Sequence, residues 1–161
     1  MNDRTTRITR QLAAPASVVF RALIDAESIK AWRFPVGMSI QVHEFEPREG
    51  GRFRISLTYH DAAAAGKTSG NTDTYHGHFE QLVEGRKVVE VLEFESGDPS
   101  LAGEMRITYD LAERDHGTTL VATHENVPPG VRLEDNELGW SMALENLAAL
   151  VESGATRGGA R

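Results

Sequence analysis

The chain has 161 residues, 40% hydrophobic and 25% charged, which is enough for one globular domain with a core. Its formal net charge is −7 and it has no concentrated Lys/Arg patch, so the composition argues against binding to nucleic acid. It contains no cysteine, which excludes disulfides, thiol catalysis and cysteine-based metal sites.

The N-terminal segment MNDRTTRITRQL lacks the apolar stretch of a secretory signal. No apolar run elsewhere approaches the ~18 residues of a membrane-spanning helix. We therefore expect a cytoplasmic protein without a membrane partner. Within this region, residues 7–14 (RITRQLAA) alternate weakly and predict a first strand.

Two short helices are predicted after this strand. Pro15 suits the first turn of a helix, where its missing N–H would have no partner. Apolar residues then recur at helical spacing from Val18 to Leu23. A second helix is predicted from Ala26 to Trp32, and Pro35 ends it by disfavouring helix in the residue before it.

From Met38 to Asn126 the hydrophobic period changes to two, which predicts strands. Six segments follow, separated by tight turns, and indicate an antiparallel meander; they are MSIQVHEFE, FRISLTY, TYHGHFEQLV, KVVEVLEFE, MRITYDL and TTLVATHE. The Ala/Gly/Ser/Thr-rich residues 60–73 are predicted to form a mobile loop. In PREGG, Gly50 and Gly51 are expected to supply positive φ angles in a hairpin turn.

The most regular segment, residues 135–153, predicts a long C-terminal helix. One face carries a stripe of apolar side chains: Ala143, Leu144, Leu147, Ala148, Leu150 and Val151. Such a stripe requires a wide apolar surface, which an alternating sheet offers. Leu138 and Met142 fall on the opposite face, which favours a homodimer contact, although scattered surface apolar residues are ordinary. Residues 154–161 are expected to form a flexible tail, so the ordered core of the single domain is residues 7–153.

The order of these elements, together with five motifs, resembles a known family. The motifs are APASVVFRALIDAESIKAW, FEPREGGRFRI, YHGHFEQLVEGRKVVEVLEFES, GTTLVATHE, and GW followed by LENLAAL. In this order they look like the Hsp90-ATPase-activator-homologue-like family of the START/Bet v 1-like superfamily, over about residues 8–152. The resemblance implies an α+β helix-grip fold, in which a curved antiparallel sheet of about seven strands surrounds the C-terminal helix.

In this superfamily the usual ligand site is a cavity between the sheet and the long helix. The resemblance would place Trp140 at the cavity mouth and the segment with Trp32 and Phe34 at its rim, although Trp140 could equally wedge the helix against the sheet. We expect the site to be lined by Trp32, Phe34, Met38, Phe53, Tyr75, Phe79, Glu90, Tyr109, His124, Trp140 and Leu144.

Glu90 is the acid that the alternation can turn inward, because Val88 and Leu92 share its face. A buried carboxylate needs a donor, and Arg106 or a tyrosine is the natural candidate. The inward polar groups of Tyr75, Tyr109 and His124 could orient a ligand hydroxyl or carbonyl, or could pair with one another and with buried water.

Other polar residues favour a solvated surface. His76 and His78 could in principle hold zinc, but Tyr75 and Phe79 alternate with them as the inward set, so we expect no metal site. Glu44 and Glu46, like Glu93 and Glu95, are expected on the wetted face. The glycine-rich PREGGRF lacks the features of a phosphate loop, and no G-x-S-x-G motif occurs, so no cofactor is expected.

These observations lead to one functional expectation and two alternatives. The expectation is binding of a small apolar or amphipathic molecule in the sheet–helix cavity, rather than catalysis. The first alternative is a cyclase- or hydratase-like enzyme that uses the inward polar residues. The second is an Hsp90 co-factor, which we rank last because the true activator carries a further N-terminal domain for which this chain leaves no room.

Overall fold

The computed structural model describes residues 4–33, 38–59, 72–115 and 117–159, with no description of the side chains of Met38, Tyr59 and 153–159. In these residues seven antiparallel strands form one sheet, in the order β1-β7-β6-β5-β4-β3-β2. Their bounds are β1 Thr6–Leu12, β2 Met38–Phe45, β3 Arg52–Tyr59, β4 Thr72–Val83, β5 Lys87–Phe94, β6 Met105–Arg114 and β7 Gly117–Glu125. The predicted helix-grip fold is confirmed.

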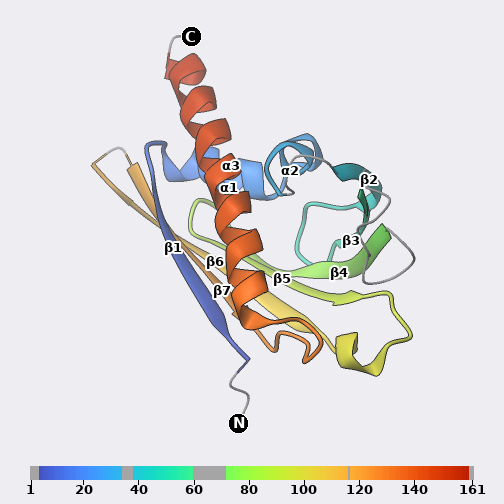
Figure 1. Ribbon diagram of the computed structural model, residues 1–161. Coiled ribbons are helices and arrows are strands. Elements are labelled where there is room, and N and C mark those ends of the chain that lie inside the picture. The colour runs from blue at the N-terminus through green and yellow to red at the C-terminus, as the bar shows by residue number, and fades with distance from the viewer. Residues whose placement is uncertain (1–3, 34–37, 60–71, 116, 160–161) are drawn as a thin grey trace.

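Three α-helices lie against this sheet: α1 Ala16–Leu23, α2 Ala26–Trp32 and α3 Leu133–Gly159, with a short 3₁₀ turn η1 at Pro99–Leu101. Figure 1 shows α3 crossing the curved sheet, with α1 and α2 at one end beside it. Pro15 precedes α1, and the Asp25 carboxylate accepts a hydrogen bond from the Ser28 backbone N–H at the start of α2. Ile24 and Asp25 alone separate the two helices, so α2 begins close to the end of α1.

The strand alternation places a continuous apolar surface on the face covered by α3. The buried inward residues of the strands include Phe53, Ile55, Leu57, Tyr75, Phe79, Val88, Leu92, Met105, Ile107, Tyr109, Leu111, Leu120 and Ala122. The pairing register shifts between Val42 and Glu44 and between Phe79 and Gln81. Such bulges bend a strand and raise its twist, which suits a sheet that wraps a helix.

The C-terminal helix packs on this surface through the predicted stripe. Ala143, Leu144, Leu147 and Val151 are buried, and Trp140, Ala148 and Leu150 are partly buried against the core. Leu138 and Met142 expose 63% and 46% of their surface, so they lie on the outer face as predicted. The homodimer they would serve stays a prediction.

The helix is longer than the sequence predicted. It begins at Leu133 and continues to Gly159, so residues 154–159, expected in a flexible tail, are helical. Each residue added to an existing helix contributes a hydrogen bond without a new nucleation cost, so a helix anchored by a buried stripe can extend beyond it.

The structure corrects the predicted role of Gly51 and the predicted end of the loop over residues 60–73. Gly50 has φ +79°, as expected, but Gly51 has no positive φ. Gly51 is instead needed for space, because a Cβ there would lie 2.1 Å from the Glu46 carbonyl oxygen. Thr72 and Asp73 belong to β4, and the remainder of the predicted loop, residues 60–71, lies outside the described residues.

Within the described ranges, no helix is both long enough and apolar enough to cross a membrane.

Candidate functional site

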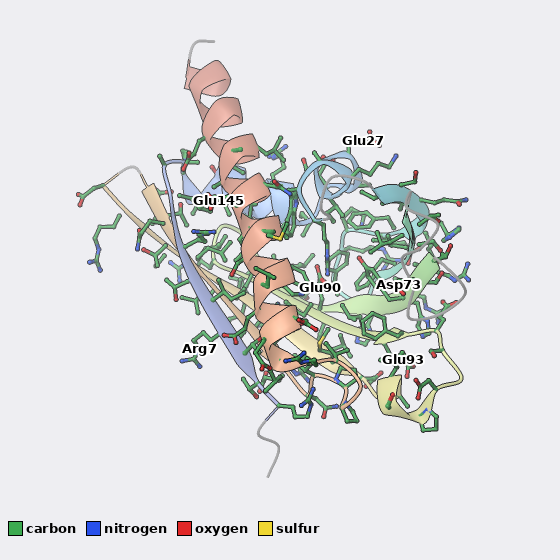
Figure 2. All side chains as sticks on the ribbon, in the orientation of Figure 1. Arg7, Glu27, Asp73, Glu90, Glu93 and Glu145 are labelled. Carbon is green, nitrogen blue, oxygen red and sulfur yellow. The ribbon has the colours of Figure 1, made fainter. Side chains whose placement is uncertain are left out.

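Polar side chains gather inside the protein, between the sheet and α3. Glu90 lies on β5, beside α3 in the view of Figure 2, and only 1% of its surface is exposed. Its inward direction, predicted from the alternation, is confirmed. We call the surrounding group the Arg33 cluster, and its members are Trp32, Arg33, Tyr75, Glu90, Tyr109, His124 and Trp140.

Arg33 provides the donor that Glu90 requires. It follows α2, and its Nη1 and Nη2 donate to Glu90 Oε2 at 3.1 Å and Oε1 at 2.7 Å. Burial by itself would lower the pKa of Arg33, but the neighbouring Glu90 carboxylate outweighs it, together with two tyrosines, and holds that pKa well above its ordinary value. The pair is therefore a fixed, buried charge pair with no net charge.

Neither candidate donor from the sequence, Arg106 or a tyrosine, pairs with Glu90 among the described residues. Arg106 was a candidate partner of Glu90, but it alternates with the inward Met105 and Ile107 and forms its ion pair with Glu80 on the outer face. Arg33 was missed because it belongs to no strand or helix whose period could orient it. The signal that could have found it is a single charge in the otherwise apolar AWRFPV.

Aromatic rings surround the Arg33 guanidinium. Its central carbon lies 5.1 Å from the ring centroid of Trp140, 5.6 Å from that of Tyr75 and 5.9 Å from that of Trp32. Trp140 also contacts the His124 ring at 4.6 Å between centroids and the Tyr109 ring at 6.3 Å. Cations are favoured over ring faces, so the rings help to hold a charge that is removed from water.

Two tyrosines point polar groups into this interior. The hydroxyls of Tyr75 and Tyr109 are buried and have no hydrogen-bond partner among the described residues. Burial raises the pKa of Tyr75 to about 12 and that of Tyr109 well above its ordinary value. Both therefore keep their protons at neutral pH and can donate as well as accept a hydrogen bond.

One ring nitrogen of His124, on β7, has hydrogen-bond partners, and the other has none among the described residues. The Asn136 amide nitrogen on α3 lies 3.0 Å from His124 Nδ1, and the Thr6 hydroxyl lies 3.2 Å from the same atom. Nε2 is buried and has no partner within the described part of the chain. Burial, aided by the charge of Arg33, lowers the pKa of His124 to about 3, so the ring is neutral.

Four buried polar atoms of the cluster are thus unpartnered among the residues described: Arg33 Nε, Tyr75 Oη, Tyr109 Oη and His124 Nε2. An unpaired buried polar group costs about 1–3 kcal/mol, so native interiors seldom leave several together. Chemically, the cluster can hydrogen-bond a small group placed between the rings, whether a water molecule or part of a ligand.

The structure brings most of the predicted lining residues into the same core. Phe53, Phe79 and Leu144 are buried, and Trp140 is half-buried. Phe34 lies outside the described residues, and Met38 is placed only as the first residue of β2. That these residues contact a ligand stays a prediction.

The predicted rim position of Trp32 is wrong. Its side chain is fully buried, and its indole N–H donates to the Ala22 carbonyl oxygen at 3.0 Å. Ala22 lies in the last turn of α1, where carbonyl groups have no partner within the helix. The end of α1 thus satisfies the indole and allows a core position.

His76, Glu93 and Glu95 lie on the outer face of the sheet, as predicted, and the structure shows that they form ion pairs there. A groove of about 500 Å³ there is bordered by side chains that include Arg54, His76 and Glu95. Arg54 Nε and His76 Nδ1 lie 2.8 Å and 2.9 Å from Glu95 Oε2. The hydrogen bonds from Arg54 lower the pKa of Glu95 to about 2. Among the described residues, no three acidic or histidine side chains could hold a metal ion.

A curved antiparallel sheet packed around a long C-terminal helix is the fold of the START/Bet v 1-like class. The chain belongs to the family described as activator of Hsp90 ATPase homolog 1-like protein, whose model matches residues 13–152. Among curated proteins there is no match.

Solved structures support the same assignment. Protein CV1439 from Chromobacterium violaceum is 32% identical, with a TM-score of 0.83 over 92% of this chain and 97% of that one. An AHSA1-like protein from Aeromonas hydrophila is 17% identical, with a TM-score of 0.68 over 92% and 94%. A protein from Rhodobacter sphaeroides is 20% identical, with a TM-score of 0.75 over 92% of each chain. The last two likenesses concern the fold alone.

Proposed function

We propose that this protein binds a small apolar or amphipathic molecule between the curved sheet and α3, with the polar part of the molecule at the Arg33 cluster. The observation that carries the proposal is the set of four buried polar atoms that have no partner among the described residues, at and around an already neutralised ion pair. A ligand that pairs with them removes a standing cost of the unliganded fold, while apolar neighbours such as Phe79 and Leu144 contact the rest of the molecule.

The proposal is tested by a thermal-shift screen of lipids, flavonoids and aromatic metabolites. A ligand that binds the folded state alone stabilises it by about 2.7 kcal/mol at a hundredfold excess over Kd, which raises the melting temperature. Trp140 belongs to the cluster and its ring lies 5.1 Å from the Arg33 guanidinium carbon, so binding there also changes the tryptophan fluorescence. If no compound of the screen shifts the melting temperature, the proposal fails.

Two variants show whether each compound that binds does so at the Arg33 cluster. Trp140→Ala removes a ring of the cluster, and Met142→Ala removes an exposed side chain two residues away on the outer face of the same helix. We expect the first to weaken binding and the second to leave it unchanged. Equal affinities for Trp140→Ala and the unmodified protein would show that the hits bind elsewhere.

An enzyme of the cyclase or hydratase kind is the second candidate, because the interior holds a carboxylate between two neutral phenols. Both Glu90 oxygens already accept hydrogen bonds from Arg33, so the carboxylate can act as a base only if that pair opens, which favours binding over catalysis. Turnover that is abolished in Glu90→Gln would support the enzyme. An Hsp90-directed role rests on the family description alone.

A further inference from the structure

The unpartnered atoms of the Arg33 cluster are mainly donors. Arg33 Nε carries a hydrogen and cannot accept. His124 Nδ1 lies 3.0 Å from the Asn136 amide nitrogen, which is a donor, so Nδ1 accepts and the ring hydrogen is on Nε2. The hydroxyls of Tyr75 and Tyr109 each add one more hydrogen. A partner for these donors must therefore offer oxygen lone pairs, and one carbonyl oxygen, with two lone pairs, can accept from two of them.

The charge of the cluster decides which kind of oxygen fits. The single cation, Arg33, already has both Nη groups on Glu90, and the tyrosines and His124 are neutral. A carboxylate or phosphate would bring a second negative charge into the same buried space, with no second cation among the described residues of the cluster to compensate it. A neutral acceptor meets the donors without that cost.

The aromatic side chains around Arg33 indicate the shape of the rest of the ligand. Rings of Trp32, Tyr75 and Trp140 lie about the guanidinium, and the Trp32 and Trp140 centroids are 6.4 Å apart. Flat unsaturated molecules stack on such rings. We propose that the Arg33 cluster recognises the oxygen of a neutral carbonyl group on a flat, largely apolar molecule. This inference rests on the proposed function and specifies its ligand class.

Titration of the protein with matched probes tests this inference. Tryptophan fluorescence and calorimetry measure the affinity for each probe. Three sizes are used, each as a ketone, a hydrocarbon and a carboxylate: acetophenone, ethylbenzene and benzoate; 2-acetonaphthone, 2-ethylnaphthalene and 2-naphthoate; 9-fluorenone, fluorene and fluorene-9-carboxylate. In the size that fits, we expect the ketone to bind about tenfold more tightly than the hydrocarbon, as two net hydrogen bonds would give. The carboxylate should bind more weakly than both.

The variants Tyr75→Phe and Tyr109→Phe keep the ring and remove one donor each. Both should lower the affinity for the ketone about threefold to tenfold and leave that for the hydrocarbon unchanged, which loss of fold would not do. Leu138→Ala, on the exposed side of α3, is the matched control and should change neither.

The outcomes separate this inference from the proposed function. Equal affinities for ketone and hydrocarbon would leave a binding protein but overturn carbonyl recognition. Tightest binding of a carboxylate would also overturn it, in favour of an anion site. If none of the nine probes binds up to its solubility, carbonyl recognition is overturned, whereas the proposed function fails only if the thermal-shift screen also gives no hit.

Discussion

Arg33 and Glu90, which are 57 positions apart in the sequence, form a two-point ion pair with side chains that expose only 3% and 1% of their surface. The pair joins the end of α2 to the middle of β5. Removing two charges from water is expensive, and their attraction often only offsets that cost. The pair is therefore better understood as fixing the position of α2 over the sheet than as a source of net stability.

Removing the charge of only one partner of the Arg33–Glu90 pair should destabilise the protein. In Glu90→Gln the guanidinium of Arg33 stays buried without a countercharge, and we expect the free energy of unfolding to fall by about 3–5 kcal/mol. In the double variant Arg33→Met, Glu90→Leu, neither charge remains, and well-packed apolar replacements of a buried pair are often neutral. Urea denaturation of the three proteins measures the difference.

The double-mutant cycle needs the single variants Arg33→Met and Glu90→Leu, and Arg54→Met serves as the surface control, because Arg54 pairs with Glu95 on the exposed face. The surface variant should lose less than about 1 kcal/mol. If the losses of Arg33→Met and Glu90→Leu simply add in the double variant, the two side chains are not coupled and the account of the pair is wrong.

The stability of the fold should depend on pH through His124. Its pKa is lowered to about 3 in the folded protein, against about 6.5 in the unfolded chain. Below pH ~6.5 the unfolded state takes up a proton that the folded state refuses, so stability is full above that pH and falls as the pH decreases toward 3. Between pH 6.5 and 5 the loss is about 2 kcal/mol.

The variant His124→Gln removes the titrating group and keeps an acceptor for Asn136. Unfolding free energies at pH 7, 6 and 5 should therefore change less in this variant than in the unmodified protein. His43→Gln is the control, because His43 lies on the exposed face and its ring hydrogen-bonds the neutral Ser56 hydroxyl, so its loss should leave the pH dependence intact. A parallel pH dependence of His124→Gln and the unmodified protein would contradict a neutral buried His124.

The fold could be predicted because each element carries its own periodic signal. Ile55 and Leu57 on β3, like Ile107 and Tyr109 on β6, alternate with polar residues, and each lies inward in the structure. The second helix was predicted with the bounds Ala26–Trp32 that it has. The alternation also turned Glu90 inward correctly, because Val88 and Leu92 share its face.

The site was only half predictable, because its contacts join residues without a common period. Tyr75, Tyr109 and His124 could be placed inside from their own strands. Arg33 stands in the short link after α2, where neither period orients a side chain, so its pairing with Glu90 required three-dimensional packing. The same applies to Trp32, whose indole partner, the Ala22 carbonyl, depends on how α1 meets α2.

Two glycines should respond to alanine in opposite directions. On β4, a Cβ at Gly77 would lie 2.0 Å from the Val91 carbonyl oxygen and 2.9 Å from the Phe53 ring, so Gly77→Ala must displace a sheet strand. We expect a loss of about 2 kcal/mol or more, as for other overpacked cores. Gly139 in α3 has no atom within 4 Å of its Cβ position, and Gly139→Ala should gain about 0.5–1 kcal/mol from helix propensity.

Thermal unfolding of the two alanine variants measures both changes. The far-ultraviolet spectrum of Gly139→Ala should match that of the unmodified protein, since the helix is already formed there. A Gly77→Ala protein as stable as the original would show that β4 and β5 do not approach as closely as the structure has them.

The two tryptophans should differ in their contribution to stability. Trp32→Phe leaves a cavity at a fully buried position and removes the donor of the Ala22 carbonyl, so we expect a loss of about 2–3 kcal/mol in unfolding free energy. Trp140 is half-buried and its indole nitrogen has no hydrogen bond among those found in the described residues, so Trp140→Phe should cost about 1 kcal/mol or less.

Acrylamide quenching distinguishes the two tryptophans. In Trp140→Phe only the buried Trp32 emits, and quenching should be weak. In Trp32→Phe only the half-buried Trp140 emits, and its fluorescence should be readily quenched. Strong quenching of Trp32 alone would contradict its core position and return it to the rim that the family resemblance implied.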